Sequence, residues 1–172
     1  MEPIEIVEYD PSWPAQFAEI AGRVRAAFAD GPPITVEHIG STSVAGLAAK
    51  PIIDIGVVVP ASSDAPDAIA RLATLGYVHQ ANLGIAGHEA FRSPANGPRH
   101  RLCVYPRYIS PLLRELLAFR DYLRTHPDEA DQYAALKKEL AARFSSDHVG
   151  YTEAKTDFVR SVLAKARGSK DG

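Results

Sequence analysis

Residues 36–55 of this 172-residue chain read VEHIGSTSVAGLAAKPIIDI, and this stretch guides the interpretation of the rest. The β-branched composition of residues 34–39 predicts a strand, which leads into the loop Gly40-Ser41-Thr42-Ser43. We expect a short helical turn over residues 44–49. A strand that feeds a small-residue loop and a helical turn presents backbone N–H groups and hydroxyls outward, which suits phosphate binding. Lys50 follows the turn and is placed to reach the same anion.

Asp54 lies within residues 52–59, which are otherwise almost continuously apolar and predict a central strand covered on both faces. A carboxylate on such a strand is costly unless it is paired, hydrogen-bonded or at the open end of the strand. A Mg²⁺ ion next to bound phosphates would meet that requirement. In the plainer interpretation the loop is an ordinary capped turn and Asp54 a hydrogen-bonded structural residue. The order and spacing of the two features together favour a functional site.

The hydrophobic pattern predicts one mixed α/β domain over residues 1–172. The expected core elements are an arm or edge strand over 4–9, helices over 12–30 and 64–75, and strands near 77–80, 87–92 and 99–105. The expected helices of the C-terminal part cover 110–125, 127–144 and 152–167. We therefore expect an α/β core over 1–106, a helical cap over 107–167 and a frayed tail over 168–172.

Composition limits the classes of function. The apolar fraction of 46% and the charged fraction of 23% are ordinary for a globular protein, and the net charge of −2 gives no reason to expect a duplex nucleic acid partner. Cys103 is the single cysteine and no signal peptide is visible, so we expect a cytoplasmic protein without an internal disulfide. The longest apolar run, residues 52–60, is too short to span a bilayer, so no membrane association is expected.

Residues 36–55 closely resemble the signature of the GrpB-like family. The resemblance extends over nearly the whole chain, through YDPSW at 9–13, FRDYLR at 119–124, residues 133–144 and YTEAKTDF at 151–158. GrpB-like proteins are similar to the polymerase-β-type nucleotidyltransferase superfamily, which implies a nucleotidyltransferase-like mixed sheet with flanking helices. Relatives are also fused to dephospho-CoA kinase in some bacteria, a hint of nucleotide or coenzyme A metabolism.

In active members of that superfamily a Gly-Ser loop holds a nucleoside triphosphate, and two carboxylates spaced Asp-x-Asp on the next strand bind Mg²⁺. The resemblance assigns Gly40 and Ser41 to the loop and Asp54 to the first metal carboxylate. The second carboxylate would fall at Gly56, and this departure weakens the case for two-metal catalysis. Glu37, on the adjoining predicted strand, is the candidate substitute as a catalytic and metal-binding carboxylate.

Further candidate site residues lie later in the chain. Glu89 offers another carboxylate, and His100 is a candidate metal ligand for which a structural role is the commoner interpretation. Arg101 is interpreted either as a solvated charge or as a phosphate contact. Lys155 is a candidate ligand contact on the last predicted helix, and Tyr151 is expected to flank the same cleft. We expect the polar residues of the helical cap to be mostly solvated, namely Arg120, Asp121, Arg124, Lys137 and Lys138.

These residues predict a Mg²⁺-dependent nucleotidyltransferase or a related phosphoryl-transfer enzyme. In this hypothesis Ser41, Thr42 and Ser43 hold phosphates of a nucleoside triphosphate, and Asp54 binds the metal while an acceptor attacks in line. The alternative is a nucleotide- or phosphometabolite-binding module that has lost catalysis, which Gly56 favours. A third interpretation is an interaction partner with a vestigial pocket. The first two both predict nucleotide binding, and only the enzyme predicts release of pyrophosphate.

Overall fold

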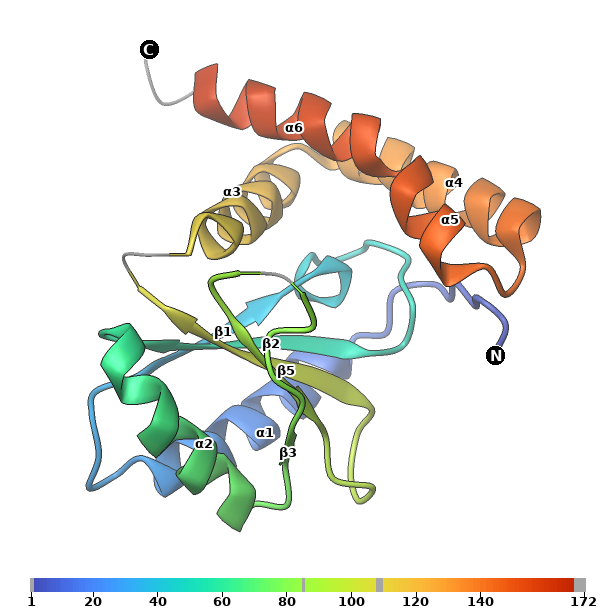
Figure 1. The fold of residues 1–172 in the computed structure, drawn as a ribbon. Helices are drawn as coiled ribbons and strands as arrows, with labels where there is room; N and C mark the ends of the chain where they lie inside the picture. The colour runs from blue at the N-terminus through green and yellow to red at the C-terminus, as the bar shows by residue number, and fades with distance from the viewer. Residues whose placement is uncertain (1, 85, 108–109, 169–172) are drawn as a thin grey trace.

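The central element of the computed structural model is a mixed β-sheet (Figure 1). Within residues 2–84, 86–107 and 110–168, which the structure describes, five strands follow the order β1-β2-β5-β4-β3. Their bounds are β1 Thr35–Ile39, β2 Ile53–Val59, β3 Val78–His79, β4 Glu89–Arg92 and β5 His100–Pro106. β2 runs parallel to β5, and the other neighbours are antiparallel. The apolar, β-branched strand β2 therefore lies inside the sheet, as expected from its sequence.

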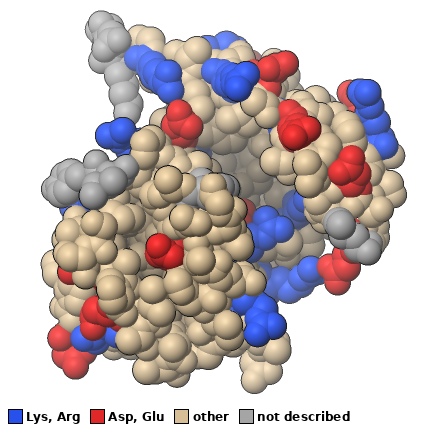
Figure 2. Space-filling view, in the orientation of Figure 1, with Lys and Arg blue, Asp and Glu red and all other residues tan. Residues whose placement is uncertain are grey.

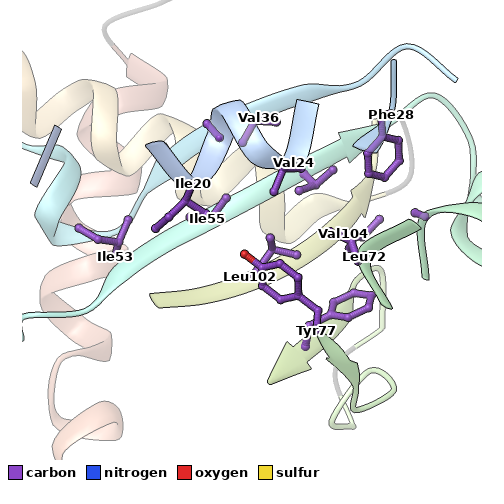
Figure 3. Close-up of a cluster of buried hydrophobic side chains, with 14 of the residues drawn as sticks. Ile20, Val24, Phe28, Val36, Ile53, Ile55, Leu72, Tyr77, Leu102 and Val104 are labelled. Atoms are coloured by element: carbon purple, nitrogen blue, oxygen red, sulfur yellow. The ribbon is translucent and has the colours of Figure 1, made fainter. Parts of the chain in front are cut away.

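Helices α1 (Trp13–Ala27) and α2 (Ala65–Thr74) cover one face of the sheet (Figure 1). Ile20 and Val24 of α1 and Leu72 of α2 pack against alternate residues of β2 and β5 (Figure 3). Ile55 and Leu102 lie at the centre of this layer and are fully buried. This face of the sheet is a hydrophobic core. It fixes β2 and β5, and with them the side chains that these strands present on the opposite face.

The opposite face carries a second layer of helices (Figure 1). Its members are α3 (Pro111–Thr125), α4 (Pro127–Phe144), α5 (His148–Ala154) and α6 (Thr156–Gly168). Pro111 and Pro127 start their helices at the position where a missing N–H costs nothing. Leu113 of α3 packs on Val58 and Tyr105 of the sheet, which fixes this layer to β2 and β5.

The structure corrects three expected boundaries. The helical turn of the central stretch is a 3₁₀ turn over Ser41–Ser43 rather than over residues 44–49, because Gly40, with φ of 71°, turns the chain as soon as β1 ends. The last helix is two helices, α5 and α6, with a break at Lys155. The first helix ends at Ala27, three residues before the expected Asp30.

The two ends of the chain were expected to form an extended arm and a frayed tail. The expected arm over residues 4–9 forms a single β-bridge between Val7 and Ala49 and no longer strand. Of the expected frayed tail, Gly168 ends α6, and residues 169–172 lie outside the described residues. Along the described part of the chain, no helix combines the length and the apolar character needed to cross a membrane.

Leu72→Ala should test the core under α2. We expect a loss of about 2–5 kcal/mol in the free energy of unfolding, measured by equilibrium urea denaturation, because the side chain is fully buried. The matched control is Leu83→Ala, whose side chain is 64% exposed and which should change the free energy by about 0.5 kcal/mol or less. Equal effects of the two variants would contradict the described core.

Candidate ligand-binding site

The side chains of β2 divide between the two faces of the sheet. Ile53, Ile55 and Val57 point toward α1 and α2, so Asp54 and Gly56 point toward the helical layer. In the strand register Asp54 lies opposite Ile39 of β1 and opposite Arg101 of β5. The sheet thus places an acid and a base next to each other on the face that α3–α6 cover.

Asp54 lies in a cavity of about 240 Å³ between the sheet and the helical layer. We call it the Asp54 cavity; it is lined by Ser41, Thr42, Ala49, Lys50, Ile52, Asp54, Arg101, Lys137, Tyr151, Thr152 and Lys155. Figure 2 shows a hollow between the two parts of the molecule, with Lys and Arg side chains gathered along its edge. The loop after β1, strands β2 and β5, and helices α4 and α5 all contribute to the lining.

Gly40 lets the loop pass directly over the Asp54 carboxylate. Its φ of 71° is a conformation that residues with a side chain rarely adopt, and a Cβ added there would overlap Asp54 Oδ2. The hydroxyl of Ser43 donates to the carbonyl of Gly40, and the N–H groups of Ser43 and Val44 donate to the loop's own carbonyls. These groups hold the loop in shape, and Ser41 and Thr42 are the loop residues that face the cavity.

Helix α3 fixes this loop from the other side. Arg120 donates to the carbonyl of His38 at 3.0 Å and forms an ion pair with Glu37 at 2.7 Å. Arg124 donates to the carbonyl of Ser43 at 3.0 Å. The expectation that Arg120 is solvated was wrong, since its side chain is only 11% exposed. Both arginines position the loop, and neither lines the Asp54 cavity.

The charges inside the cavity are unbalanced. Burial raises the pKa of Asp54 to about 6, and the charges of Arg101, Lys155 and Lys50 oppose that rise. Burial, followed by the positive charge of Arg101, lowers the pKa of Lys50. Among the described residues that line the cavity, Asp54 is the one carboxylate, and Lys50, Arg101, Lys137 and Lys155 are basic. The cavity therefore has an excess of positive charge for an anion to neutralise.

Lys137 and Lys155 are the most strongly perturbed of these bases. Lys137 is 2% exposed, donates to the carbonyl of Ala48 and lies 4.6 Å from the centre of the Tyr133 ring. Burial and the nearby Lys155 lower the pKa of Lys137 to about 7. Lys155 lies 4.2 Å from the centre of the Tyr151 ring, and burial together with Lys50 lowers its pKa to about 8. An anion in the cavity would favour the charged form of both lysines.

Sequence reasoning missed Lys137, which was wrongly expected on a solvated helix face. A usable signal was present, because Lys137 follows Tyr133 by four residues and precedes Leu140 by three, so it shares their buried stripe on α4. Tyr151 and Lys155 lie in the cavity lining, where the sequence predicted them. The break between α5 and α6 brings Lys155 there.

Two candidate carboxylates are not brought to Asp54. Glu37 shares its face of the sheet but is engaged by Arg120, and it lies opposite Gly56 in the register. Glu89 points to the other face, opposite Val104, and contacts His79 at 2.6 Å. At Gly56, where the second metal carboxylate would stand, an added Cβ would lie 3.4 Å from the Tyr105 ring. The aromatic ring leaves little room for a second acid.

His100 is also directed away from the cavity. It pairs with Ile53 and therefore faces the α1–α2 side, where the Tyr77 hydroxyl donates to Nε2 at 2.7 Å. Its Nδ1 donates to the carbonyl of Pro98 at 2.7 Å, so both ring nitrogens are engaged. In the ranges 2–84, 86–107 and 110–168, no three His, Cys, Asp or Glu side chains cluster closely enough to hold a metal ion.

The chain is similar to known proteins over almost its whole length. The model of the GrpB protein family matches residues 3–165. The chain belongs to the GrpB family.

It is 39% identical to a UPF0157 protein of Pseudomonas aeruginosa, over 95% of this chain and 67% of that protein. It is 35% identical to the UPF0157 protein YqkA of Bacillus subtilis, over 98% of this chain but 49% of that protein, so it spans about half of this relative. The dephospho-CoA kinase of Mycolicibacterium paratuberculosis is 27% identical over 95% of this chain and 46% of the kinase.

Solved structures define the fold of this GrpB-family chain. The crystal structure of the conserved protein GrpB from Enterococcus faecalis matches with a TM-score of 0.84 and 32% identity, over 98% of this chain and all of that chain. The structure of Cid1 poly(U) polymerase with a UTP analogue matches with a TM-score of 0.55 and 12% identity, over 80% of this chain and 43% of Cid1. The fold is therefore nucleotidyltransferase-like, as the resemblance in the sequence implied.

Gly40→Ala should separate backbone strain from contact with Asp54. We expect a loss of about 2–6 kcal/mol in the free energy of unfolding, because an alanine in the Gly40 conformation, with φ of 71° and ψ of −175°, costs about 1–3 kcal/mol and overlap adds about 1–3 kcal/mol. Gly46→Ala is the matched control: its φ is 81°, but an added Cβ meets nothing within 4 Å, so only the strain of about 1–2 kcal/mol applies. Urea denaturation of both variants measures the difference, and equal losses would refute the close approach of Gly40 to Asp54.

Proposed function

We propose that the Asp54 cavity binds the phosphate groups of a nucleotide or a similar phosphorylated metabolite. The observation that carries this proposal is the excess of positive charge around one carboxylate, with four basic side chains in the described lining of a 240 Å³ cavity. Partial burial strengthens each charge interaction relative to water, so a small anion gains more here than at an exposed lysine cluster. The likeness to a dephospho-CoA kinase, by its name an enzyme of phosphorylated substrates, supports this substrate class.

Each residue has a distinct part in this proposal. Arg101 presents a planar guanidinium that suits two phosphate oxygens at once, while Lys50 and Lys155 act as point charges. Ser41 offers a hydroxyl at the loop side of the cavity. Lys137 reaches the cavity from α4 and is held by the carbonyl of Ala48, so it is already positioned when the anion arrives. Such prior positioning lowers the entropic cost of binding.

The residues present do not fit a two-metal centre. Among the described residues no second free carboxylate lies beside Asp54, because Glu37 is paired with Arg120 and Gly56 lies against Tyr105. The four basic side chains would repel a divalent cation that arrived without an anion.

Nucleotidyl transfer is the second candidate function. Asp54 on β2 next to the Gly40–Ser41 loop favours it, since the chain has a nucleotidyltransferase-like fold and this pair is the one that the family resemblance assigns. In such a reaction the cavity would contribute by orienting the phosphates and by stabilising charge on the leaving group. Release of pyrophosphate from a nucleoside triphosphate distinguishes this function from binding alone.

Isothermal titration with ATP, GTP, CTP and UTP, with and without Mg²⁺, tests the proposal. We expect at least one nucleotide to bind, and Lys155→Ala and Arg101→Ala to weaken that binding by about tenfold or more, since each removes a charged contact worth about 1.5–3 kcal/mol. Lys138→Ala is the matched control, because Lys138 is the neighbour of Lys137 on α4 but is 46% exposed and paired with Glu8.

Asp54→Asn separates the two candidate functions in the same experiment. If the cavity is an anion site, removal of the carboxylate relieves repulsion and binding without Mg²⁺ becomes tighter. If Asp54 recruits a metal with the nucleotide, the variant loses binding that depends on Mg²⁺. We expect the first result. The absence of binding by any nucleotide at millimolar concentration would overturn the proposed function.

Anion affinity should fall as pH rises from 5 to about 9. Lys137 and Lys155 have pKa values of about 7 and 8, so each loses its positive charge within this window, and Asp54, with a pKa of about 6, gains a negative charge. All three changes act against an anion. Sulfate is the probe, since it stays doubly charged across the range, and its binding is measured by titration calorimetry.

The variant Lys155→Arg serves as the control for that pH profile. Arginine stays protonated throughout the range, so the decline in sulfate affinity around pH 8 should become smaller. An affinity for sulfate that is independent of pH in the unmodified chain would show that these lysines do not contact the anion.

A further inference from the structure

The Asp54 cavity adjoins a second, larger hollow of about 570 Å³. The two share Thr152 and Lys155 in their linings, so they meet at the junction of α5 and α6. We call the larger hollow the α6 groove; it is lined by Glu115, Tyr133, Thr152, Lys155, Thr156, Val159, Arg160, Leu163, Ala164 and Arg167. A ligand held by Lys155 could therefore extend from one space into the other.

The two spaces differ in chemistry. Val159 and Leu163, four residues apart, lie on one side of α6, and together with Ala164 they give the hollow an apolar wall. Polar residues also line it: Thr152, which it shares with the Asp54 cavity, Thr156, and the ion pair of Glu115 and Arg167 at 3.3 Å. The α6 groove thus suits a flat, mostly apolar group with hydrogen-bonding edges.

A different hollow adjoins the opposite end of the Asp54 cavity. It measures about 370 Å³ and shares Lys50, Ile52 and Arg101 with the cavity. Its lining is largely charged, since it adds Glu2, Glu5, Arg99 and His148, and Glu2 already pairs with Arg99 at 2.8 Å. Of these two openings, the α6 groove is the one with an apolar wall.

Size supports a ligand that uses both the cavity and the α6 groove. Sites for small molecules usually measure about 300–1,000 Å³. The Asp54 cavity alone, at about 240 Å³, is smaller than this, and the addition of the α6 groove brings the site within that range. With phosphates in the first space, the second would be open to a larger group of the same ligand.

We infer that the α6 groove binds the nucleoside part of a nucleotide whose phosphates lie in the Asp54 cavity. This inference rests on the proposed function and makes it more specific, since it excludes inorganic phosphates and small sugar phosphates as the preferred ligands. The base lies against Val159 and Leu163, and Lys155 stands where the nucleoside joins the phosphates. The ligand is thus oriented with its phosphates toward Lys50 and Arg101.

Ala164→Trp tests this orientation by filling the groove from an exposed position of α6. The matched control is Ser161→Trp, which adds the same side chain to an exposed position of the same helix that does not line the groove. Titration calorimetry compares inorganic tripolyphosphate with the nucleoside triphosphate that binds most tightly. We expect Ala164→Trp to weaken nucleotide binding by about tenfold and to leave tripolyphosphate binding within about twofold, while Ser161→Trp changes neither.

The outcomes separate this inference from the proposed function. Equal affinities for tripolyphosphate and nucleotide in the unmodified chain, or equal losses in the two tryptophan variants, would overturn the assignment of the α6 groove and leave the anion site intact. If neither ligand binds, the proposed function fails, and the assignment of the groove fails with it. Unchanged tripolyphosphate binding by Ala164→Trp also shows that the variant is folded.

Discussion

Burial of the Asp54 carboxylate on the central strand is the constraint on which the arrangement around it depends. An isolated carboxylate in such a place would be costly, and the fold offsets that cost with positive charge from three separate parts of the chain. Lys50 comes from the loop before β2, Arg101 from β5 and Lys155 from the junction of α5 and α6. The compensation exceeds the need, because Lys137 adds another positive charge from α4. One acid therefore organises a cavity whose net charge is positive.

One face of the sheet forms the hydrophobic core, and the other carries the proposed binding site. On the α1–α2 face, β2 contributes Ile53, Ile55 and Val57 to a continuous apolar core that holds the strands in register. On the other face the same strand presents Asp54 and Gly56, where Gly40 and Tyr105 approach closely. Close contact with Asp54 and with Tyr105 thus explains the glycines at positions 40 and 56. Gly56 makes space for an aromatic ring at the position where a catalytic relative would carry an acid, which favours binding over two-metal chemistry.

How much the sequence predicted depended on the range of the interactions involved. Strand β2 was predicted almost to the residue, because a long β-branched apolar run has one stable location, inside a covered sheet. The loop and Asp54 were predicted to form one site, and the antiparallel pairing that sets Ile39 of β1 opposite Asp54 of β2 makes them neighbours. Lys137 was missed because a lysine in an apolar stripe is usually exposed, and its burial depends on the distant carbonyl of Ala48. The spacing from Tyr133 and Leu140 pointed to the buried face of α4, but the partner of Lys137, which is far away in sequence, is not visible in a local pattern.

The break between α5 and α6 shows how tertiary structure overrides a local pattern in favour of a site. No glycine or proline stands at Lys155, so residues 152–167 predicted one continuous helix. The sequence nevertheless contains a helix N-cap upstream, because the Asp147 side chain accepts a hydrogen bond from the N–H of Gly150 at 3.0 Å and α5 starts there. With that start fixed, Tyr151 of α5 and Lys155 at its C-terminal end line the cavity, and α6 contributes the apolar wall of the groove. Thr152, Lys155, Thr156, Val159 and Leu163 recur at the spacing of one helical stripe, so a single side of this segment contributes to both spaces.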